Sequence, residues 1–393
     1  MDIIKTHGFM GQMTPSATLA ITSKAKAMKA AGEDVCSLCA GEPDFDTPDH
    51  IKNAAIEALN KGMTKYTPAT GCIEFKNVIA DKFRTENAIQ TTAEQIVISP
   101  GAKFSVFATV AALCGPGDNA VITAPYWLSY PEMIKSTGAE VRVLNASAEN
   151  NYELNPEELE NIVDKNTKLL ILNTPSNPTG AIYSKQTLEK ISEIAIRNNF
   201  IVLADEIYEK LTYDADKPHI SIASLSSEIN ARTVTVNGMS KAYSMTGWRI
   251  GYLTAPLWLT KKIAALQSHT TSNPTTFAQY GGIAAITGTQ EPVEQMRNAF
   301  AKRRDLIFSL FSSMDKVSCI RPSGAFYLFC DISETGDDSL EFCSKLLEQE
   351  KTAVIPGTPF GASTSIRLSY ACADSVIKEA AARIERFIEK NYS

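Results

Sequence analysis

The 393-residue sequence has no long apolar run, no excess of basic residues and no internal repeat. None of its apolar stretches approaches the roughly 18–20 residues of a membrane-spanning helix, and the N-terminus lacks a basic segment followed by a long apolar one. Lys and Arg number 38 against 44 Asp and Glu, which gives a net charge of −6. Because surfaces that follow nucleic-acid phosphates need clustered basic residues, we expect no nucleic-acid partner, and for the same reason no contact with an anionic membrane surface. Together with the lack of a signal or membrane segment, this predicts a cytoplasmic location.

Cysteine and histidine are also scarce. Eight scattered cysteines in a chain of this length do not make a disulfide framework, which favours a reducing compartment. The closest pair, Cys36 and Cys39, lies in a short predicted strand, where an odd spacing sends the two side chains to opposite faces as apolar fillers. The four histidines lack metal-ligand spacing, so we predict no metal site and assign them no role.

What the sequence does contain is a recurring short apolar run followed by a longer helical pattern. This alternation predicts an α/β domain over residues 48–300, with a mostly parallel sheet covered by helices on both faces. Residues 301–393 order their strands and helices differently and predict a smaller α+β domain, on which residues 1–47 are expected to dock. A chain of this length has room for two such domains.

The main predicted elements are strands and helices of ordinary length. The strands are 95–98, 119–123, 168–173, 200–205, 233–236, 249–253, 326–330, 352–355 and 365–368. The helices are 102–114, 126–137, 185–198, 291–314, 339–350 and 374–390.

Polar residues follow the apolar runs of the predicted sheet, where the ligand crevice of an open α/β sheet lies. Lys241 follows one such run. A lysine that is desolvated beside another cation has a lowered amine pKa and can form a Schiff base with a carbonyl. Since most lysines are solvated surface groups, this interpretation depends on the neighbours of Lys241.

Asp205 ends another apolar run, and two interpretations are open for it. It is either a helix N-cap or the partner of a pyridinium nitrogen, which keeps the ring protonated as an electron sink. In the second case Tyr208 would reach the phenolic oxygen of the ring, and Asn177 would act as a neutral donor. Trp127 could stack on a planar ring, although a single Trp is more often part of a core.

A third set of residues suits a phosphate. Gly101, Ala102 and Lys103 open a helix after a strand, where backbone N–H groups hold an anion, or where a glycine simply makes a turn. Ser240 and Arg249 would add a hydroxyl and a bidentate guanidinium.

Arg367 suits a carboxylate because it lies inside a strand-like run, 364–370. A cation at such a position either faces solvent on an edge strand or is buried against a carboxylate, and bidentate recognition of a carboxylate favours arginine.

Together these residues resemble the fold-type I pyridoxal-phosphate (PLP) aminotransferases, and more narrowly the bacterial-type aspartate aminotransferases of class I. The segment 238–251, GMSKAYSMTGWRIG, fits the lysine-attachment pattern of that family. The resemblance extends over nearly the whole chain, through segments 15–18 and 41–45 and Lys65-Tyr66 to the Arg367 segment. It implies a large PLP-binding domain with a mostly parallel seven-stranded sheet, plus the smaller α+β domain.

The resemblance also implies a role for each residue. Lys241 would hold the cofactor as a Schiff base and then move the proton at the substrate carbon, while Asp205 would pair with the pyridinium. Tyr66 of the partner subunit would reach the phosphate, which implies a homodimer with a shared active site. The other implied contacts are Tyr208 and Asn177 with the ring oxygen, Trp127 with the ring face and the substrate, Gly101, Ala102, Lys103, Ser240 and Arg249 with the phosphate, and Arg367, Asn177 and Gly41 with the substrate α-carboxylate.

The implied reaction is a ping-pong transfer of the amino group from L-aspartate to 2-oxoglutarate, which gives oxaloacetate and L-glutamate. The partners of the enzyme would be small amino acids and 2-oxo acids. Bacterial-type relatives place a lysine at the position of Lys103 toward the distal carboxylate of a dicarboxylate, and Lys103 together with Arg367 favours such a substrate.

Three alternatives are open. A broader aminotransferase would act on aromatic amino acids, kynurenine, alanine or prephenate. Relatives that accept prephenate carry a lysine directly before the Pro15 segment, where this chain has Met13-Thr14, which argues against prephenate. A second alternative is a PLP lyase or synthase of the same fold. The third is a ligand sensor of this fold, which would carry a DNA-binding extension, and we expect no such extension.

Overall fold

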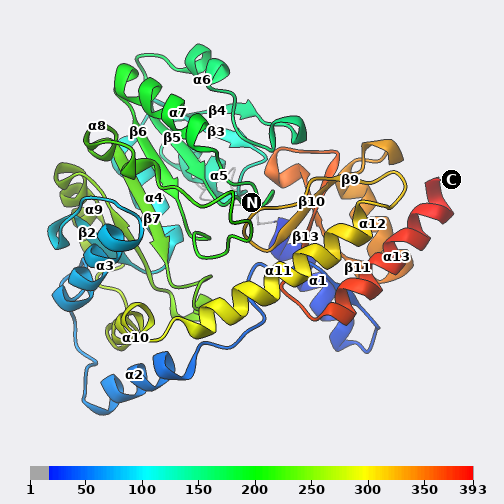
Figure 1. Ribbon diagram of the computed structural model, residues 1–393, viewed down its shortest axis with the longest axis horizontal. Coiled ribbons are helices and arrows are strands. Elements are labelled where there is room, and N and C mark those ends of the chain that lie inside the picture. The colour runs from blue at the N-terminus through cyan, green and yellow to red at the C-terminus, as the bar shows by residue number, and fades with distance from the viewer. Residues whose placement is uncertain (1–16, 393) are drawn as a thin grey trace, which may run out of the picture.

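A seven-stranded sheet forms the centre of the larger part of the chain (Figure 1). The structure is a computed structural model that describes residues 17–392. The strand order is β2-β8-β7-β6-β5-β3-β4, and β8 runs antiparallel to both of its neighbours while all other neighbouring strands are parallel. The strands are β2 (Ile96–Ser99), β3 (Asn119–Ala124), β4 (Glu140–Asn145), β5 (Thr167–Asn173), β6 (Ile201–Asp205), β7 (Thr233–Gly238) and β8 (Gly251–Thr254). The predicted mostly parallel sheet is confirmed.

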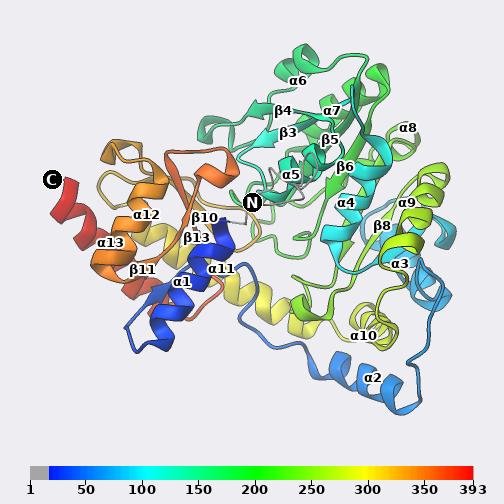
Figure 2. The same ribbon diagram turned by 180° about the vertical axis from the view of Figure 1, so that it is seen from behind.

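Helices cover both faces of this sheet (Figures 1 and 2). Because successive strand residues point to opposite faces, neighbours such as Leu170 and Ile171 belong to different buried apolar clusters. Each fully buried aliphatic side chain in these clusters stabilises the fold by about 1.5–3 kcal/mol. One face packs on α4 (Ala102–Leu113), α5 (Ser129–Ser136) and α9 (Leu257–Thr270), and the other on α3 (Ile73–Glu86), α6 (Pro156–Ile162), α7 (Lys185–Asn198), α8 (Ser227–Asn230) and α10 (Thr276–Thr287), with α2 (Asp49–Asn60) against α10.

The smaller part is built from both ends of the described chain. A four-stranded antiparallel sheet has the order β12 (Ile355–Pro356), β13 (Ser365–Ser369), β10 (Tyr327–Asp331), β9 (Ser318–Cys319). A parallel pair, β1 (Cys36–Ser37) with β11 (Thr352–Ala353), attaches the N-terminal segment to it. The helices here are α1 (Ala17–Ala30), α12 (Ser339–Glu350) and α13 (Asp374–Tyr392).

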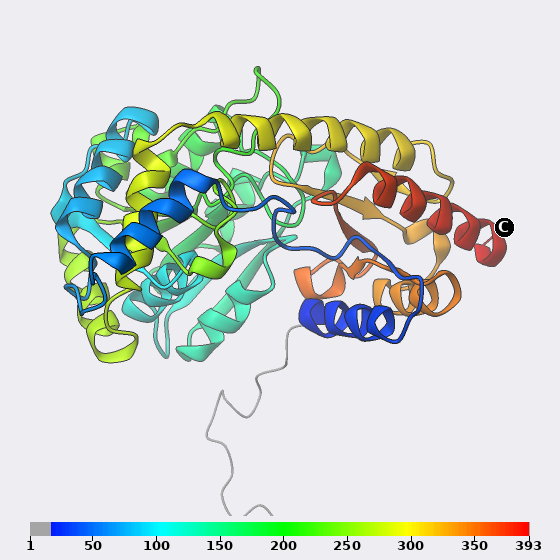
Figure 3. The same cartoon turned by 90° about the horizontal axis from the view of Figure 1, so that it is seen from below.

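One long helix, α11 (Glu291–Phe311), connects the two parts (Figure 3). The predicted boundary at residue 300 falls inside this helix, so the assignment of 48–300 to one domain and of 1–47 with 301–393 to another stays a prediction. None of the helices within residues 17–392 is long and apolar enough to cross a membrane.

Several predicted elements have different bounds in the structure. The predicted strand 352–355 is divided into two short strands, because Thr352 and Ala353 pair with β1 whereas Ile355 and Pro356 pair with β13. The helix predicted from residue 126 begins at Ser129, since the N–H of Tyr126 bonds to the carbonyl of Phe360. The strand predicted from residue 249 begins at Gly251, because Arg249 has a left-handed φ of 56°. The edge strand β4 was not predicted.

Candidate active site

A cavity of about 380 Å³ lies at the carboxyl ends of the parallel strands, where β10 and β13 of the smaller part close it. Eleven of the thirteen predicted site residues line it: Gly41, Ala102, Lys103, Trp127, Asn177, Asp205, Tyr208, Ser240, Lys241, Arg249 and Arg367. Gly101 adjoins the cavity as the residue before α4. Tyr66 does not line it and is 90% exposed. The predicted site residues between Ala102 and Arg249 therefore meet at one edge of the sheet, and Arg367 reaches them from the smaller part.

Lys241 lies in the turn that follows β7 and is half-buried. Its Nζ donates a hydrogen bond to the backbone carbonyl of Gly41. Burial lowers the pKa of Lys241 to about 8; the carboxylate of Glu42 opposes this shift, and the guanidinium groups of Arg367 and Arg249 add to it. With that pKa, about one molecule in ten carries an unprotonated amine at pH 7, which makes Lys241 a competent nucleophile and base.

Asp205 is the last residue of β6 and only 5% exposed. The hydroxyl of Tyr130 donates to its Oδ2 at 2.8 Å, and the N–H of Ile207 donates to its Oδ1 at 3.3 Å. Burial raises the pKa of Asp205 to about 6, although both hydrogen bonds favour the charged form. The helix N-cap interpretation is wrong, because residues 207–210 form a turn and not a helix.

Two tyrosines complete the wall beside Lys241. The hydroxyl groups of Tyr208 and Tyr327 lie 3.0 Å apart, and Tyr327 comes from β10 of the smaller part. Lys241 Nζ lies 5.9 Å from the centroid of the Tyr208 ring. Sequence reasoning missed Tyr130 and Tyr327, since an aromatic residue within a predicted helix or strand cannot be distinguished from an ordinary core residue.

An anion-binding corner lies at the start of α4. Gly101 has a φ of 89°, and a Cβ atom at this position would lie 2.3 Å from Nη2 of Arg249. Only glycine therefore lets the guanidinium approach the first turn of the helix, where Ala102 and Lys103 present their N–H groups. Ser240 lines the same cavity. Hydroxyl, guanidinium and helix N-terminus are groups that can hold a dianion such as a phosphate monoester.

Lys103 adds a second positive group to this corner. Its Nζ lies 4.9 Å from the centroid of the Trp127 ring, and burial together with the nearby Arg249 lowers its pKa. Trp127 in turn packs edge-on against Tyr130 with ring centroids 5.3 Å apart. The indole is thus held at the cavity wall by neighbours on two sides.

Arg367 lies on β13 and is 3% exposed. Its Nη1 donates to Oδ1 of Asn177 at 3.0 Å, and its Nη2 lies 3.4 Å from the carbonyl of Cys39. The guanidinium stacks over the Tyr327 ring at 4.4 Å, and its Nε has no partner. No acidic side chain of residues 17–392 pairs with it within 4.0 Å. A buried guanidinium that has only neutral partners is expected where a protein binds the carboxylate of a ligand.

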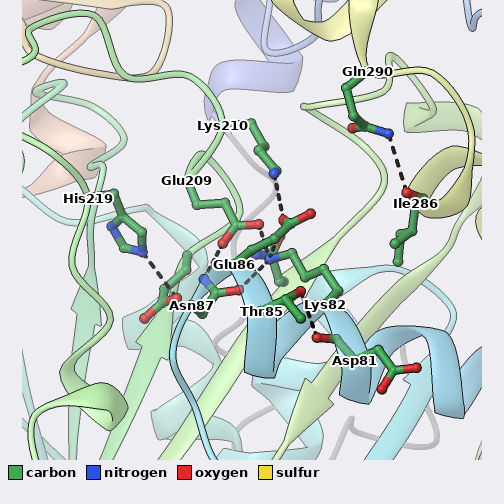
Figure 4. A network of polar contacts seen from close by, with 12 residues as sticks. Asp81, Lys82, Thr85, Glu86, Asn87, Glu209, Lys210, His219, Ile286 and Gln290 are labelled. Carbon is green, nitrogen blue, oxygen red and sulfur yellow. Dashed lines mark hydrogen bonds and ion pairs between the residues drawn. The ribbon is translucent and has the colours of Figure 1, made fainter.

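A buried polar network anchors the segment behind Asp205 and Tyr208 (Figure 4). The ammonium of Lys82, from α3, pairs with the carboxylate of Glu209 and donates to Oδ1 of Asn87 at 2.7 Å. The Asn87 amide closes the triangle by donating to Oε2 of Glu209 at 2.6 Å. Burial by itself would raise the pKa of Glu209. The charges of Lys82 and His219 and two hydrogen bonds have the larger, opposite effect and lower this pKa to about 2.

His219 takes part in this network, although no role was expected for it from the sequence. Its Nε2 lies 3.1 Å from Oε2 of the fully buried Glu206, whose Oε1 accepts a hydrogen bond from Ser221 at 2.7 Å. The ligand atoms of Glu206, Glu209 and His219 lie within 4.8 Å of one another, close enough to share a metal ion. Lys82 already supplies a positive charge at Glu209, so the absence of a metal site stays our prediction.

Replacing Lys82 with methionine is expected to lower the free energy of unfolding by about 3–5 kcal/mol, because the carboxylate of Glu209 would remain buried without its counter-charge. Urea unfolding at pH 7 measures the change. Lys76→Met, on the same helix, is the matched control and should cost less than about 1 kcal/mol. A Lys82→Met protein as stable as the control would contradict the role of the pair.

The same pair predicts a pH dependence. Since the pKa of Glu209 is lower in the folded than in the unfolded chain, its contribution is present above about pH 4.5 and is lost as the pH falls toward about 2. In Glu209→Gln this part of the acid-induced loss of stability disappears.

Comparisons with known proteins agree with the fold. Residues 33–384 match the family model described as aminotransferase class I and II. An aspartate aminotransferase of Bacillus subtilis (strain 168) is 45% identical over 96% of this chain and 98% of the relative. An aspartate/prephenate aminotransferase of Cereibacter sphaeroides is 42% identical over 96% of this chain and 97% of the relative.

Among solved structures, an aspartate aminotransferase from Thermus thermophilus with maleate superposes with a TM-score of 0.94 at 38% identity, covering 98% of this chain and 100% of that one. The chain therefore belongs to the aminotransferase class I and II family, as the sequence predicted.

Proposed function

We propose that this chain is a PLP-dependent aminotransferase that moves the amino group of L-aspartate to 2-oxoglutarate by a ping-pong mechanism. The observation that carries the proposal is Arg367, a buried cation without an acidic partner in the cavity that also holds Lys241. A substrate carboxylate would supply the missing negative charge. It would also accept a hydrogen bond from Nε of Arg367, which has no partner among the described residues.

The cavity fits pyridoxal 5'-phosphate. The space that a Cβ atom at Gly101 would fill is left to the guanidinium of Arg249, beside the first turn of α4, which suits the phosphate of the cofactor. Asp205 offers a buried carboxylate to the ring nitrogen, and Trp127 offers a face to the ring. When bound, PLP supplies a conjugated, protonated ring that stabilises a carbanion at the substrate carbon.

The side chains of this protein then have distinct tasks. Lys241, with its pKa lowered to about 8, holds the cofactor and afterwards accepts and returns the proton at the substrate α-carbon. Arg367 and Asn177 hold the α-carboxylate, so that the bond to be broken keeps one orientation. Asp205 keeps a proton on the ring nitrogen, and the hydroxyl of Tyr208 donates to the ring oxygen.

The choice of a dicarboxylate substrate rests on Lys103. Its ammonium lies at the cavity wall without an acidic partner within 4.0 Å among the described residues, and it would meet the distal carboxylate of aspartate or 2-oxoglutarate. Because both half-reactions of the proposed cycle use dicarboxylates, the same two cations would serve both. The solved Thermus thermophilus relative is described with maleate, which is itself a dicarboxylate.

Single half-reactions test the substrate. Mixing the holoenzyme with one amino acid at a time and following the visible absorbance of the bound cofactor should show L-aspartate and L-glutamate reacting fastest. Release of 2-oxo acid separates transamination from elimination by a lyase. If alanine or phenylalanine reacts as fast as aspartate, the proposed specificity is wrong.

Lys103→Met should sharpen this result, since the variant keeps the backbone N–H at the phosphate and loses only the ammonium. We expect kcat/KM for aspartate to fall about 10- to 150-fold, the equivalent of one charge-assisted hydrogen bond, with alanine unaffected. Lys378→Met, an exposed lysine on α13, is the matched control. An equal loss for both substrates would place Lys103 outside the substrate site.

A broader specificity is the second candidate. The Cereibacter sphaeroides relative is named for prephenate as well as aspartate, so prephenate and aromatic amino acids belong in the same panel. The residues that argue against prephenate, Met13 and Thr14, lie outside the described residues.

We further propose a homodimer in which Tyr66 completes the phosphate site of the partner chain. In support, Tyr66 is 90% exposed and lies outside the cavity of its own chain. Sedimentation of the holoenzyme at the mass of a single 42.8 kDa chain would contradict the homodimer. A cytoplasmic location is proposed on the reduced state expected of the eight cysteines.

A further inference from the structure

Two cysteines lie opposite each other at the edge of the small antiparallel sheet. Strand β9 is the edge strand, and its register with β10 places Cys319 directly across from Cys330. Directly opposed residues of antiparallel strands have Cα atoms about 4.5–5.5 Å apart, and a disulfide spans Cα separations of about 4.4–6.8 Å. Because directly opposed residues of an antiparallel pair point to the same face, the two side chains also lie on the same side of the sheet. A disulfide would therefore need little movement of the backbone.

The two thiols differ in their access to solvent. Cys319 is half-buried on the free edge of the sheet, whereas Cys330 is fully buried among the core residues between β10 and the helices. The neighbouring Cys330 thiol lowers the pKa of Cys319, which favours the Cys319 thiolate, while burial raises the pKa of Cys330. An oxidant from solvent thus meets Cys319 first, and Cys330 is in place to react second.

We propose that Cys319 and Cys330 form a modification site that takes a reversible disulfide from low-molecular-weight disulfides such as oxidised glutathione. The Cys319 thiolate attacks one sulfur of the oxidant, forms a mixed disulfide and releases one thiol. The Cys330 sulfur then attacks the Cys319 sulfur and releases the second thiol. Two protein thiols are oxidised, the S–S bond of the oxidant is reduced, and the two thiol protons pass to the released thiolates.

The disulfide would close the loop of residues 320–329, which reaches the active site. In this loop Arg321 pairs with Asp305 and Asp214, and the N–H groups of Ser323 and Gly324 both donate to the carbonyl of Gly180. The same loop leads into Tyr327, whose hydroxyl meets that of Tyr208. Closing a short loop restricts the unfolded chain, so we expect the oxidised protein to melt about 2–4 °C higher than the reduced one.

The experiment uses the full-length holoenzyme in glutathione buffers of increasing oxidised fraction, followed by alkylation, non-reducing digestion and mass spectrometry. The expected product is a peptide pair linked through Cys319 and Cys330, with free thiols falling from eight to six and recovering in dithiothreitol. A stable glutathione adduct at Cys319 with Cys330 still free, a link between another pair, or no reaction at Cys319 would each overturn the proposal.

Three variants separate a specific site from general oxidation. Cys319→Ser should lose both the linked peptides and the rise in melting temperature. Cys330→Ala should stop at the glutathione adduct of Cys319. Cys372→Ser, at the other half-buried cysteine, is the matched control and should behave as the unmodified protein. Retention of the rise in melting temperature by Cys319→Ser would contradict the assignment.

Discussion

Lys241→Ala is expected to lose transamination by at least about 10⁴-fold, because the variant lacks both the amine that holds the cofactor and the base that moves the substrate proton. The cofactor should still bind through the α4 N-terminus and Arg249, so the loss would lie in kcat more than in KM. An assay of oxaloacetate formed from aspartate and 2-oxoglutarate measures the change. Lys378→Ala, exposed on α13, is the control and should keep full activity.

Direct mapping complements the activity assay. Borohydride reduction of the holoenzyme, followed by digestion and mass spectrometry, should leave the cofactor on Lys241 and on no other lysine. Since the pKa of Lys241 is about 8, its unprotonated fraction grows as the pH rises. The rate at which the cofactor-free protein takes up PLP should therefore increase up to about pH 8 and then level off. An unmodified Lys241 in a cofactor-bearing protein would refute the proposed mechanism.

Asp205→Ala has the second largest expected effect, a fall in kcat of at least about 10³-fold with the cofactor retained. The reason is that the ring nitrogen would lose the only buried carboxylate among the described residues that line the cavity, while the phosphate contacts at Gly101 and Arg249 remain. Steady-state kinetics together with a titration of PLP binding separates the two effects.

Tyr130→Phe is the matched variant for Asp205, because it removes only the phenol that donates to the carboxylate at 2.8 Å. We expect a loss of about 10-fold or less, the equivalent of one hydrogen bond. Near-normal turnover in Asp205→Ala would show that the residue serves only the turn in which it holds the N–H of Ile207.

The sequence predicted the sheet well because most of its buried parallel strands read as apolar runs bounded by polar residues. The helix Lys185–Asn198 and the helix Ser339–Glu350 have the predicted bounds, since Ser184 and Asp338 cap their first turns through side-chain oxygens. Edge strand β4 was not predicted, because its residues are mostly exposed or half-buried and do not form the apolar run of a central strand.

Errors concentrated where pairing partners far along the chain decide the local structure. Residues 352–356 are short enough to form one strand, yet their two ends belong to different sheets. The start of α5 depends on Phe360, some 230 residues away, which binds the N–H of Tyr126. Local propensity carries no information about such partners.

The sequence by itself placed the polar residues that follow the parallel strands near Lys241, because the carboxyl ends of parallel strands meet at one edge of a sheet. It also supplied the family, through the segment around Lys241. Tertiary structure alone decided the electrostatics. Whether Arg367 is solvated, paired or waiting for a substrate depends on which acids surround it, and none of the described ones does.

The same holds for the thiols. Ten residues lie between Cys319 and Cys330, and no sequence rule pairs the two cysteines. They became neighbours because two antiparallel strands took a particular register, and register is fixed by the packing of whole faces.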